Sequence, residues 1–368
     1  MSELRPANRL IDKAHQTLAT VYPSKARPAA PWEAHRAPRG YGAPVEPDWR
    51  EIDWPPLVRR AQLSTGDMTY VDLGDGDDPP IVFLHGLGGQ WQNWLENIPR
   101  AAQERRTIAV DLPGFGTSPM PTEDISVSLY ARLVEELLEQ LGIESAVIVG
   151  NSMGGFVGAD LCIQYPARVD QLVLAAACGI STTSLRQRPV MTAFSVAGVI
   201  SSATLARSYH VVARPRLRHP VLASVIRHPL RLRPDVLLQI MPGSNNPGFM
   251  PALESLLEYD LTDRLGEIHC PTLLVWGRED VLVPVADADE YERLIPDARK
   301  VVFDETGHMP MLERPGEFND ALMGFVSAES VGAPTASADA RSDGAPAETS
   351  SNGSAPAVGE RAQPVSAP

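Results

Sequence analysis

Cysteine is scarce in this chain of 368 residues. Its three cysteines, Cys162, Cys178 and Cys270, are too few and too widely spaced for a disulfide scaffold or a cysteine-rich zinc site. The sequence also lacks an apolar run of 18 residues that could span a bilayer, and its N-terminal residues lack the unbroken apolar stretch of a secretory signal. These absences predict a soluble protein in a reducing compartment, the cytoplasm.

Positive charge is in the minority. Against 46 Asp and Glu residues stand 32 Lys and Arg residues, which gives a net charge of −14. A surface of this sign repels the phosphate backbone of nucleic acids, so we expect no nucleic-acid partner.

Proline is plentiful at the N-terminal end, and small residues dominate the C-terminal end. Residues 1–55 predict an irregular proline-rich arm, whose order is left open and which Trp32, Tyr41, Trp49 and Trp54 could dock onto a folded body. Residues 328–368 are mostly Ala, Pro, Ser and Gly. Such a segment buries too little apolar surface to offset its ordering entropy, so we expect a disordered tail.

Between these ends, at 56–327, uniformly apolar runs alternate with helical patterns. Strands that are apolar on both sides need cover on both faces, which favours the α/β class with a mostly parallel twisted sheet between two layers of helices. The strand-like runs lie at 68–73, 81–86, 107–112, 145–150, 171–176, 272–277 and 299–303, and helical patterns lie at 128–142 and near 317–326.

An insert at about 179–268 interrupts this alternation and reads as an α-helical lid with prolines as breaks. From Arg186 to Arg233 it holds nine arginines and neither an acidic residue nor a lysine. Such a lid could attract an anionic substrate or contact an anionic membrane surface; alternatively, the arginines pair with the acidic core. The uncharged stretch at 190–206 could line an acyl pocket or simply pack the lid.

One pentapeptide indicates a catalytic serine. Gly150-Asn151-Ser152-Met153-Gly154 follows a buried strand and opens a helix. A sharp strand-to-helix turn of this kind needs small residues two positions before and two after the serine, and it presents the serine hydroxyl at a helix N-terminus. Ser152 is therefore the predicted nucleophile.

A serine needs a base and a carboxylate to become a good nucleophile. His308 follows the strand at 299–303 and would lie at the same sheet edge as Ser152. Asp280 follows the strand at 272–277, and Glu279 is its nearest competitor. No acidic residue occurs between Asp170 and Asp235, so the loop after the strand at 171–176 cannot supply the carboxylate.

Acyl transfer also needs hydrogen-bond donors for the oxyanion. The strand at 81–84 ends in His85-Gly86-Leu87-Gly88-Gly89, where glycines allow backbone amides to face the site. We expect the Leu87 amide to act together with the amide of Met153, the residue after the nucleophile.

Taken together, these motifs resemble the α/β-hydrolase superfamily over residues 60–327, with the triad in the chain order Ser152, Asp280, His308. Residues 111–118 look like the loop after the family's fourth strand, and residues 307–308 with 313–315 look like its histidine loop. The resemblance implies a lid after the sixth strand, no cofactor and no metal.

The resemblance leaves several reactions open. Dehalogenases and epoxide hydrolases of this fold carry Asp where Ser152 stands, so both are disfavoured. Serine hydrolases that cleave carbon–carbon bonds in ring-fission products are similar around Ser152, but they typically follow the histidine with Trp, where this chain has Met309. Cofactor-free haloperoxidases and a non-catalytic receptor or scaffold are further alternatives.

The preferred interpretation is a carboxylic-ester hydrolase. It would act through an acyl-enzyme on a small-to-medium, fairly apolar acyl substrate, which is its only predicted partner. The sequence predicts neither the identity of this substrate nor an oligomeric state.

Overall fold

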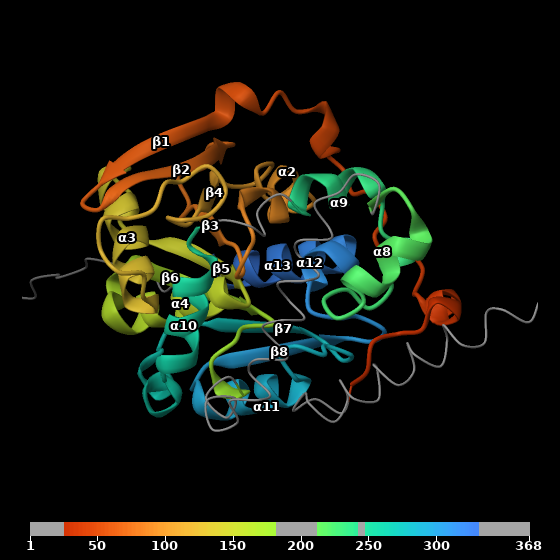
Figure 1. Cartoon of the computed structure of the whole chain (residues 1–368). Coiled ribbons are helices and arrows are strands. Elements are labelled where there is room, and N and C mark those ends of the chain that lie inside the picture. The colour runs from red at the N-terminus through yellow and green to blue at the C-terminus, as the bar shows by residue number, and fades with distance from the viewer. Residues whose placement is uncertain (1–25, 182–211, 242–246, 331–368) are drawn as a thin grey trace, which may run out of the picture. The chain divides into compact units, whose positions relative to one another are not determined.

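A computed structural model describes residues 26–181, 212–241 and 247–330. Its centre is one eight-stranded sheet with the order β1-β2-β4-β3-β5-β6-β7-β8 (Figure 1). The strands are β1 (Val58–Leu63), β2 (Gly66–Leu73), β3 (Ile81–Leu84), β4 (Thr107–Asp111), β5 (Ala146–Asn151), β6 (Val169–Ala175), β7 (Thr272–Gly277) and β8 (Ala298–Phe303).

Six of the eight strands form a parallel array, from β4 through β3, β5, β6 and β7 to β8. Strand β2 pairs antiparallel with β4, and β1 pairs antiparallel with β2 at the sheet edge. The α/β class with a mostly parallel sheet is therefore confirmed. Strand β1 was not predicted.

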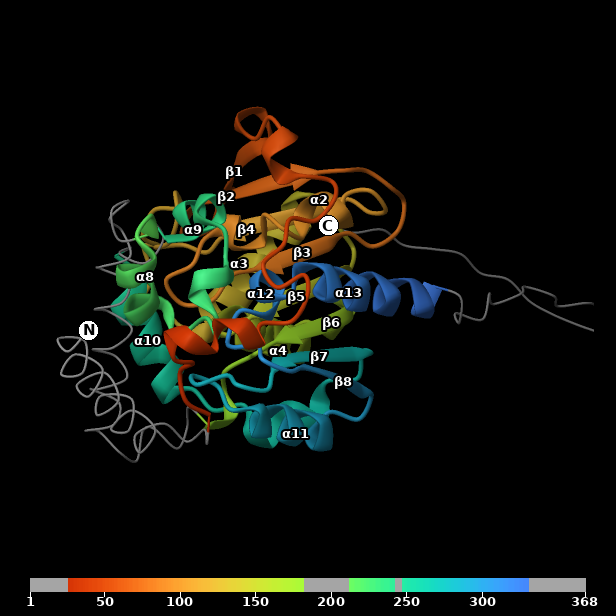
Figure 2. The same ribbon diagram turned by 90° about the vertical axis from the view of Figure 1, so that its right-hand side faces the viewer.

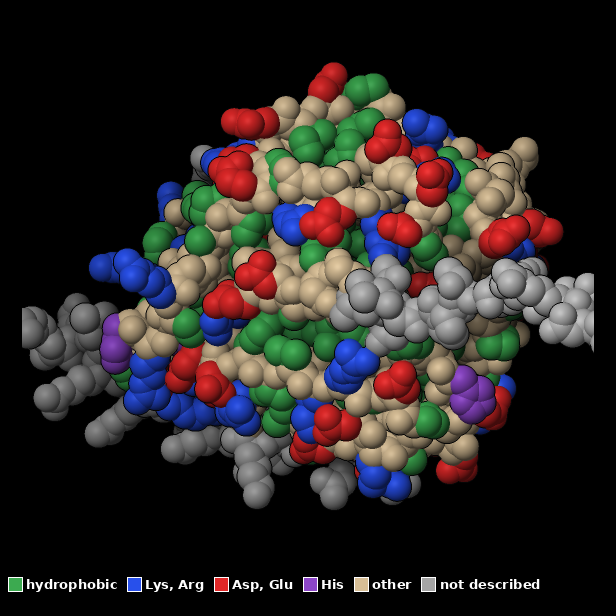
Figure 3. All heavy atoms as spheres, turned by 180° about the vertical axis from the view of Figure 1, so that it is seen from behind, with side chains coloured by type: hydrophobic (Ala, Val, Ile, Leu, Met, Phe, Trp, Pro, Cys, Tyr) green, Lys and Arg blue, Asp and Glu red, His purple; other side chains and the backbone are tan. Residues whose placement is uncertain are grey.

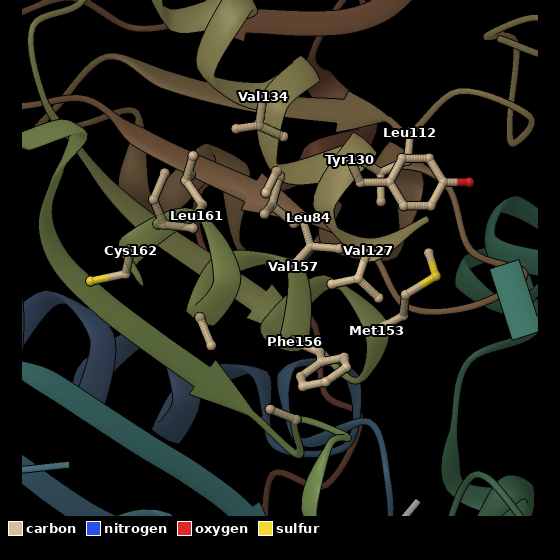
Figure 4. Packing of buried hydrophobic residues seen from close by; sticks show 14 of the residues in the cluster. Leu84, Leu112, Val127, Tyr130, Val134, Met153, Phe156, Val157, Leu161 and Cys162 are labelled. Carbon is tan, nitrogen blue, oxygen red and sulfur yellow. The ribbon is translucent and has the colours of Figure 1, made fainter. Parts of the chain in front are cut away.

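Side chains of successive residues in the central strands point to opposite faces of the sheet, so they pack into two separate hydrophobic cores. In β5, Ile148 packs on one face, whereas Val147 and Val149 pack on the other. The first core contains residues of α3 (Val127–Gln140), α4 (Met153–Gln164) and α11 (Val285–Leu294); the second contains residues of α2 (Ile98–Ala101) and α13 (Pro315–Ser330). Figure 4 shows the first core, where α4 packs against β3 and α3.

Local sequence explains the two helices nearest the predicted nucleophile. Helix α3 begins after Ser126, whose hydroxyl accepts a hydrogen bond from the Leu129 amide at 3.0 Å. Helix α4 has no solvent-exposed face over most of its length, since every residue from Met153 to Ile163 is buried. This burial holds the start of α4 firmly against the sheet.

Helix α13 ends at Ser330, so it includes the first residues of the predicted tail. Residues 331–368 lie outside the described part of the chain. Further short elements of this body are η4 (Trp91–Trp94), η5 (Pro166–Arg168), η8 (Thr262–Glu267) and α12 (Pro310–Glu313).

The N-terminal arm is described from residue 26. It contains only short 3-10 turns, η1 (Pro31–Arg36), η2 (Trp49–Glu51) and η3 (Pro55–Leu57). Tyr41 and Trp49 are buried and Trp54 is half-buried, whereas Trp32 is 60% exposed. Three of the four aromatic residues thus attach the arm to the body.

The described part of the insert is helical, with η6 (Pro229–Arg231) and the helices α8 (Pro215–Leu222), α9 (Pro234–Ile240) and α10 (Phe249–Glu258). Prolines open three of these elements, because the first helical position needs no amide donor, and a further proline, Pro220, lies inside α8. The prediction of a pocket-lining helix at 190–206 lies outside the described residues.

Six of the nine arginines between Arg186 and Arg233 are described, and three of them contact protein groups. Arg218 donates to the carbonyls of Leu230 and Leu232, Arg227 pairs with Glu305, and Arg233 pairs with Glu96. The described arginines that remain are exposed: Arg214, Arg216 and Arg231. Anionic-substrate attraction and membrane contact stay predictions for these.

Acidic and basic side chains are interspersed over the face seen in Figure 3, so the negative net charge is not gathered into one patch there. In the described ranges, no helix is long and apolar enough to cross a membrane. All three cysteines are free thiols.

Candidate active site

Ser152 lies in the sharp turn between β5 and α4. Its backbone adopts φ 53° and ψ −116°, a conformation that costs a non-glycine residue free energy. Two backbone hydrogen bonds hold it there: the Ser152 amide donates to the Ala175 carbonyl at 3.0 Å, and the Cys178 amide donates to the Ser152 carbonyl at 3.2 Å. The half-buried serine therefore stands at the N-terminus of α4 in a strained, fixed position.

The two flanking glycines of the pentapeptide are sterically required. A Cβ atom on Gly150 would lie 2.2 Å from the Gly154 carbonyl oxygen, and a Cβ atom on Gly154 would lie 2.2 Å from the Leu84 carbonyl oxygen. Both contacts are with backbone, which cannot rotate away as a side chain could. The spacing seen in the sequence is thus a packing requirement of the turn.

The structure brings His308 and Asp280 together. The His308 Nδ1 atom lies 2.8 Å from the Asp280 Oδ2 atom. An ionised carboxylate can only accept, so this contact places the ring proton on Nδ1 and leaves Nε2 with its lone pair. The backbone of His308 is held by donation from its amide to the Val225 carbonyl at 2.9 Å.

Asp280 is fully buried, and its other oxygen is also occupied. Oδ1 accepts hydrogen bonds from the amides of Leu282 at 2.8 Å and Val283 at 2.9 Å. The competing carboxylate, Glu279, instead accepts from the Thr306 amide at 3.0 Å. Asp280 is therefore the carboxylate that orients the histidine ring.

Asn151 also holds the histidine loop, a role that the sequence did not suggest. Its side-chain nitrogen donates to the carbonyls of His308 at 3.2 Å and Ala175 at 3.0 Å. Asn151 thus connects the turn of Ser152 to the loop of His308. The only sequence signal was its place inside the pentapeptide.

The glycine-rich loop after β3 lies directly against Ser152. A Cβ atom on Gly86 would lie 3.1 Å from the Ser152 Cβ atom, and the Gly89 amide closes a turn on the Gly86 carbonyl at 2.9 Å. Leu87 lies inside this turn, and Met153 is the first residue of α4, where an amide has no partner within the helix. The two predicted oxyanion donors thus belong to segments that meet at Ser152.

His85 fixes this loop and is not a second base. Its Nδ1 atom contacts the Gly86 carbonyl at 2.8 Å, and its Nε2 atom accepts from the Leu112 amide at 3.0 Å. Complete burial lowers the pKa of His85 to about 4. The ring is therefore neutral at physiological pH, and both nitrogens hold backbone in place.

The described residues contain no group of three or more His, Cys, Asp or Glu side chains that could hold a metal ion. What the described site offers is a strained serine at a helix N-terminus, a histidine oriented by a buried carboxylate, and a glycine turn beside the serine. Groups of this kind are suited to nucleophilic attack on an acyl carbon followed by proton transfer.

Residues 81–321 match the family model of the alpha/beta hydrolase family, so the chain belongs to that family. This match begins at β3 and ends within α13; it therefore contains all of the predicted site residues and leaves out the N-terminal arm.

Two curated relatives are each 30% identical to this chain. One is the 2-hydroxy-6-oxo-6-phenylhexa-2,4-dienoate hydrolase of Comamonas testosteroni, aligned over 72% of this chain and 95% of the relative. The other is the putative carbamate hydrolase RutD of Escherichia coli O150:H5 (strain SE15), aligned over 67% of this chain and 91% of the relative.

Among solved structures, Est816, described as an N-acyl homoserine lactone degrading enzyme, superimposes with a TM-score of 0.57 and 26% identity. The alignment covers 73% of this chain and all of that one. These proteins are named for different substrates, so the family establishes a hydrolase and leaves the scissile bond open.

Proposed function

We propose that the protein is a serine hydrolase that cleaves carboxylic esters through an acyl-enzyme, on small-to-medium apolar acyl substrates. The observation that carries this proposal is the 2.8 Å contact between His308 and buried Asp280 at the sheet edge where β5 presents Ser152. The contact gives the histidine the tautomer that a general base for serine requires.

In the proposed reaction, the Ser152 hydroxyl attacks the ester carbonyl while His308 Nε2 takes its proton. The tetrahedral oxyanion accepts hydrogen bonds from the Leu87 and Met153 amides, each of which is worth roughly a hundredfold to a thousandfold in turnover. His308 then passes the proton to the leaving alcohol, and the acyl group stays on Ser152 Oγ.

Water completes the cycle. His308 takes a proton from a water molecule, the resulting hydroxide attacks the acyl carbon, and the proton returns to Ser152 as the carboxylic acid leaves. Asp280 stabilises the imidazolium in both half-reactions, and its two backbone donors, Leu282 and Val283, hold its other oxygen in place. None of these steps draws on a cofactor or a metal.

Carbon–carbon hydrolysis is the second candidate, because the Comamonas testosteroni relative is named for a ring-fission product. The same serine and histidine would serve that reaction. The residue after the histidine argues against it: Met309 is buried and packs in the second core, where those hydrolases typically carry Trp.

The test is steady-state hydrolysis of p-nitrophenyl esters from acetate to palmitate, alongside a ring-fission dienoate, with wild type and Ser152→Ala. We expect Ser152-dependent turnover of the esters, with an optimum at short to medium chains. Turnover of the dienoate in preference to every ester would replace ester hydrolysis by carbon–carbon cleavage. Binding of either compound without turnover would support the receptor alternative.

A further inference from the structure

The N-terminal arm lies outside the family match and yet reaches the histidine loop. Figures 1 and 2 show its red segment on the side of the molecule that carries α8 and α12. The Gly42 amide donates to the main-chain carbonyl of Glu313 at 2.8 Å, which fixes the arm to the last residue of α12. The arm therefore contacts an element that begins two residues after His308.

Glu313 is a completely buried carboxylate that accepts hydrogen bonds from the histidine loop on both sides of His308. Its Oε2 atom accepts from the Gly307 amide at 2.9 Å, and its Oε1 atom accepts from the Met309 amide at 3.1 Å. These are the two residues that flank His308 in the chain. The position of this carboxylate therefore sets the position of the loop backbone.

The insert and the arm complete the set of donors to Glu313. The Arg227 amide donates to Oε2 at 2.9 Å, and the Tyr41 hydroxyl donates a short hydrogen bond to the same atom. Tyr41 is held in turn by the His228 amide, which donates to its hydroxyl at 2.8 Å, and by an edge-on contact with the His228 ring. One tyrosine thus connects the arm, the insert and the histidine loop.

Burial raises the pKa of Glu313, and the Tyr41 hydroxyl opposes that rise more strongly than any backbone donor. Three of the four donors are amides, which can only donate, so both carboxylate oxygens must accept. Loss of the tyrosine donor would leave a buried carboxylate with less compensation and a looser position.

We propose that Tyr41 and Glu313 are positioning residues for His308, through which the N-terminal arm supports the hydrolytic reaction. This inference rests on the proposed function. The carboxylate holds the amides of Gly307 and Met309, and these hold the imidazole against Asp280. Misplacement of a catalytic group by about 1 Å can cost a hundredfold in rate, so a small displacement of the loop is sufficient.

The test compares Tyr41→Phe with Tyr259→Phe. Tyr259 is a matched control: its hydroxyl accepts from Ser128 at 2.9 Å and donates to the buried carboxylate of Asp160 at 2.8 Å, remote in the chain from the histidine loop. Both variants lose one hydroxyl that bridges a donor and a buried carboxylate, so similar decreases in melting temperature are expected.

We expect Tyr41→Phe to lower kcat for the best ester by about tenfold with KM within about twofold, since the loss concerns the reacting groups and not substrate binding. Tyr259→Phe should stay within about twofold of wild type in kcat. The same kcat in both variants would overturn the inference. In Glu313→Gln one oxygen becomes a donor that faces backbone amides, so its loss of kcat should be larger.

A second measurement does not depend on turnover. The His308 Nδ1 proton, hydrogen-bonded to Asp280, should give a far-downfield NMR resonance that is absent in His308→Gln. We expect this resonance to shift or broaden in Tyr41→Phe and to stay in place in Tyr259→Phe. An unchanged resonance in Tyr41→Phe would overturn the positioning role, whereas a shift in a protein that hydrolyses no ester would support it and reject only the proposed function.

Discussion

Replacement of Asp280 by asparagine gives the sharpest prediction, because the carboxylate serves three donors at once. Oδ1 accepts two backbone amides, and Oδ2 accepts the His308 Nδ1 proton. Asparagine has only one accepting oxygen. Facing Leu282 and Val283, this oxygen accepts two hydrogen bonds, whereas facing His308 it accepts one, so we expect it to face the two amides. Its NH₂ group then faces His308 Nδ1, which must become the acceptor.

The histidine proton is thereby moved to Nε2, where the base for Ser152 needs a lone pair. Loss of the correct tautomer in a serine–histidine–aspartate site costs about 10⁴ in kcat, or about 5.4 kcal/mol in activation free energy. We expect a loss of this size in Asp280→Asn with the fold intact, because the side-chain volume and the two backbone hydrogen bonds are kept.

The assay is kcat and KM for the best p-nitrophenyl ester, with Glu279→Gln as the matched control. The glutamine oxygen can still accept from Thr306, so this variant should keep its activity within about threefold. The reasoning is refuted if Asp280→Asn retains more than about a tenth of wild-type kcat, or if Glu279→Gln shows the large loss instead.

Three further predictions concern the nucleophile, its turn and a buried acid. Ser152→Ala should lower kcat by roughly 10⁶ with little change in melting temperature, measured by ester hydrolysis and thermal scans; residual activity at wild-type level would mean another nucleophile. In urea unfolding, Gly154→Ala should lower the free energy of unfolding by about 3 kcal/mol or more, because the new Cβ atom collides with the Leu84 carbonyl oxygen. Gly324→Ala should not lower it, because no atom lies within 4 Å of a Cβ atom at that position. Burial raises the pKa of Asp287 to about 6, so the folded state favours its protonated form and this residue makes stability fall as pH rises from about 4 to about 6. The free energy of unfolding of Asp287→Asn, measured in urea melts, should therefore rise relative to that of wild type by up to about 3 kcal/mol between about pH 4 and about pH 6. If the difference in unfolding free energy between the two proteins does not change with pH, the burial argument is contradicted.

The sheet and the turn of Ser152 were predictable because their signals are local. Strands covered on both faces must be apolar throughout, as in β5, and the turn after β5 forbids side chains at Gly150 and Gly154. A window of five to ten residues contains both constraints. The predicted fold class follows from them without knowledge of distant contacts.

Strand β1 escaped prediction for an equally physical reason. Four of its six residues are exposed, including Arg59 and Arg60, because it pairs only with β2 at the sheet edge. An edge strand of this kind carries neither an apolar run nor a clear alternation. Its pairing is fixed by the partner strand, which the local sequence does not contain.

The support of the histidine loop depends on long-range contacts. Tyr41 and Glu313 are separated by 272 positions, and no periodicity relates them. The sequence left open whether the aromatic residues of the arm dock it onto the body, and it gave no indication of the acceptor of the Tyr41 hydroxyl. The sequence predicts the reacting groups, and the folded structure adds the network that holds the loop of His308.

The central claim is that Ser152 is a nucleophile activated by His308. Its most direct test is to treat the full-length protein with a fluorophosphonate, digest it, and locate the adduct by mass spectrometry. The account predicts one adduct of full occupancy, on the peptide that contains Ser152, and its loss in His308→Gln. An adduct on another residue, or none on the folded wild-type protein, would contradict it.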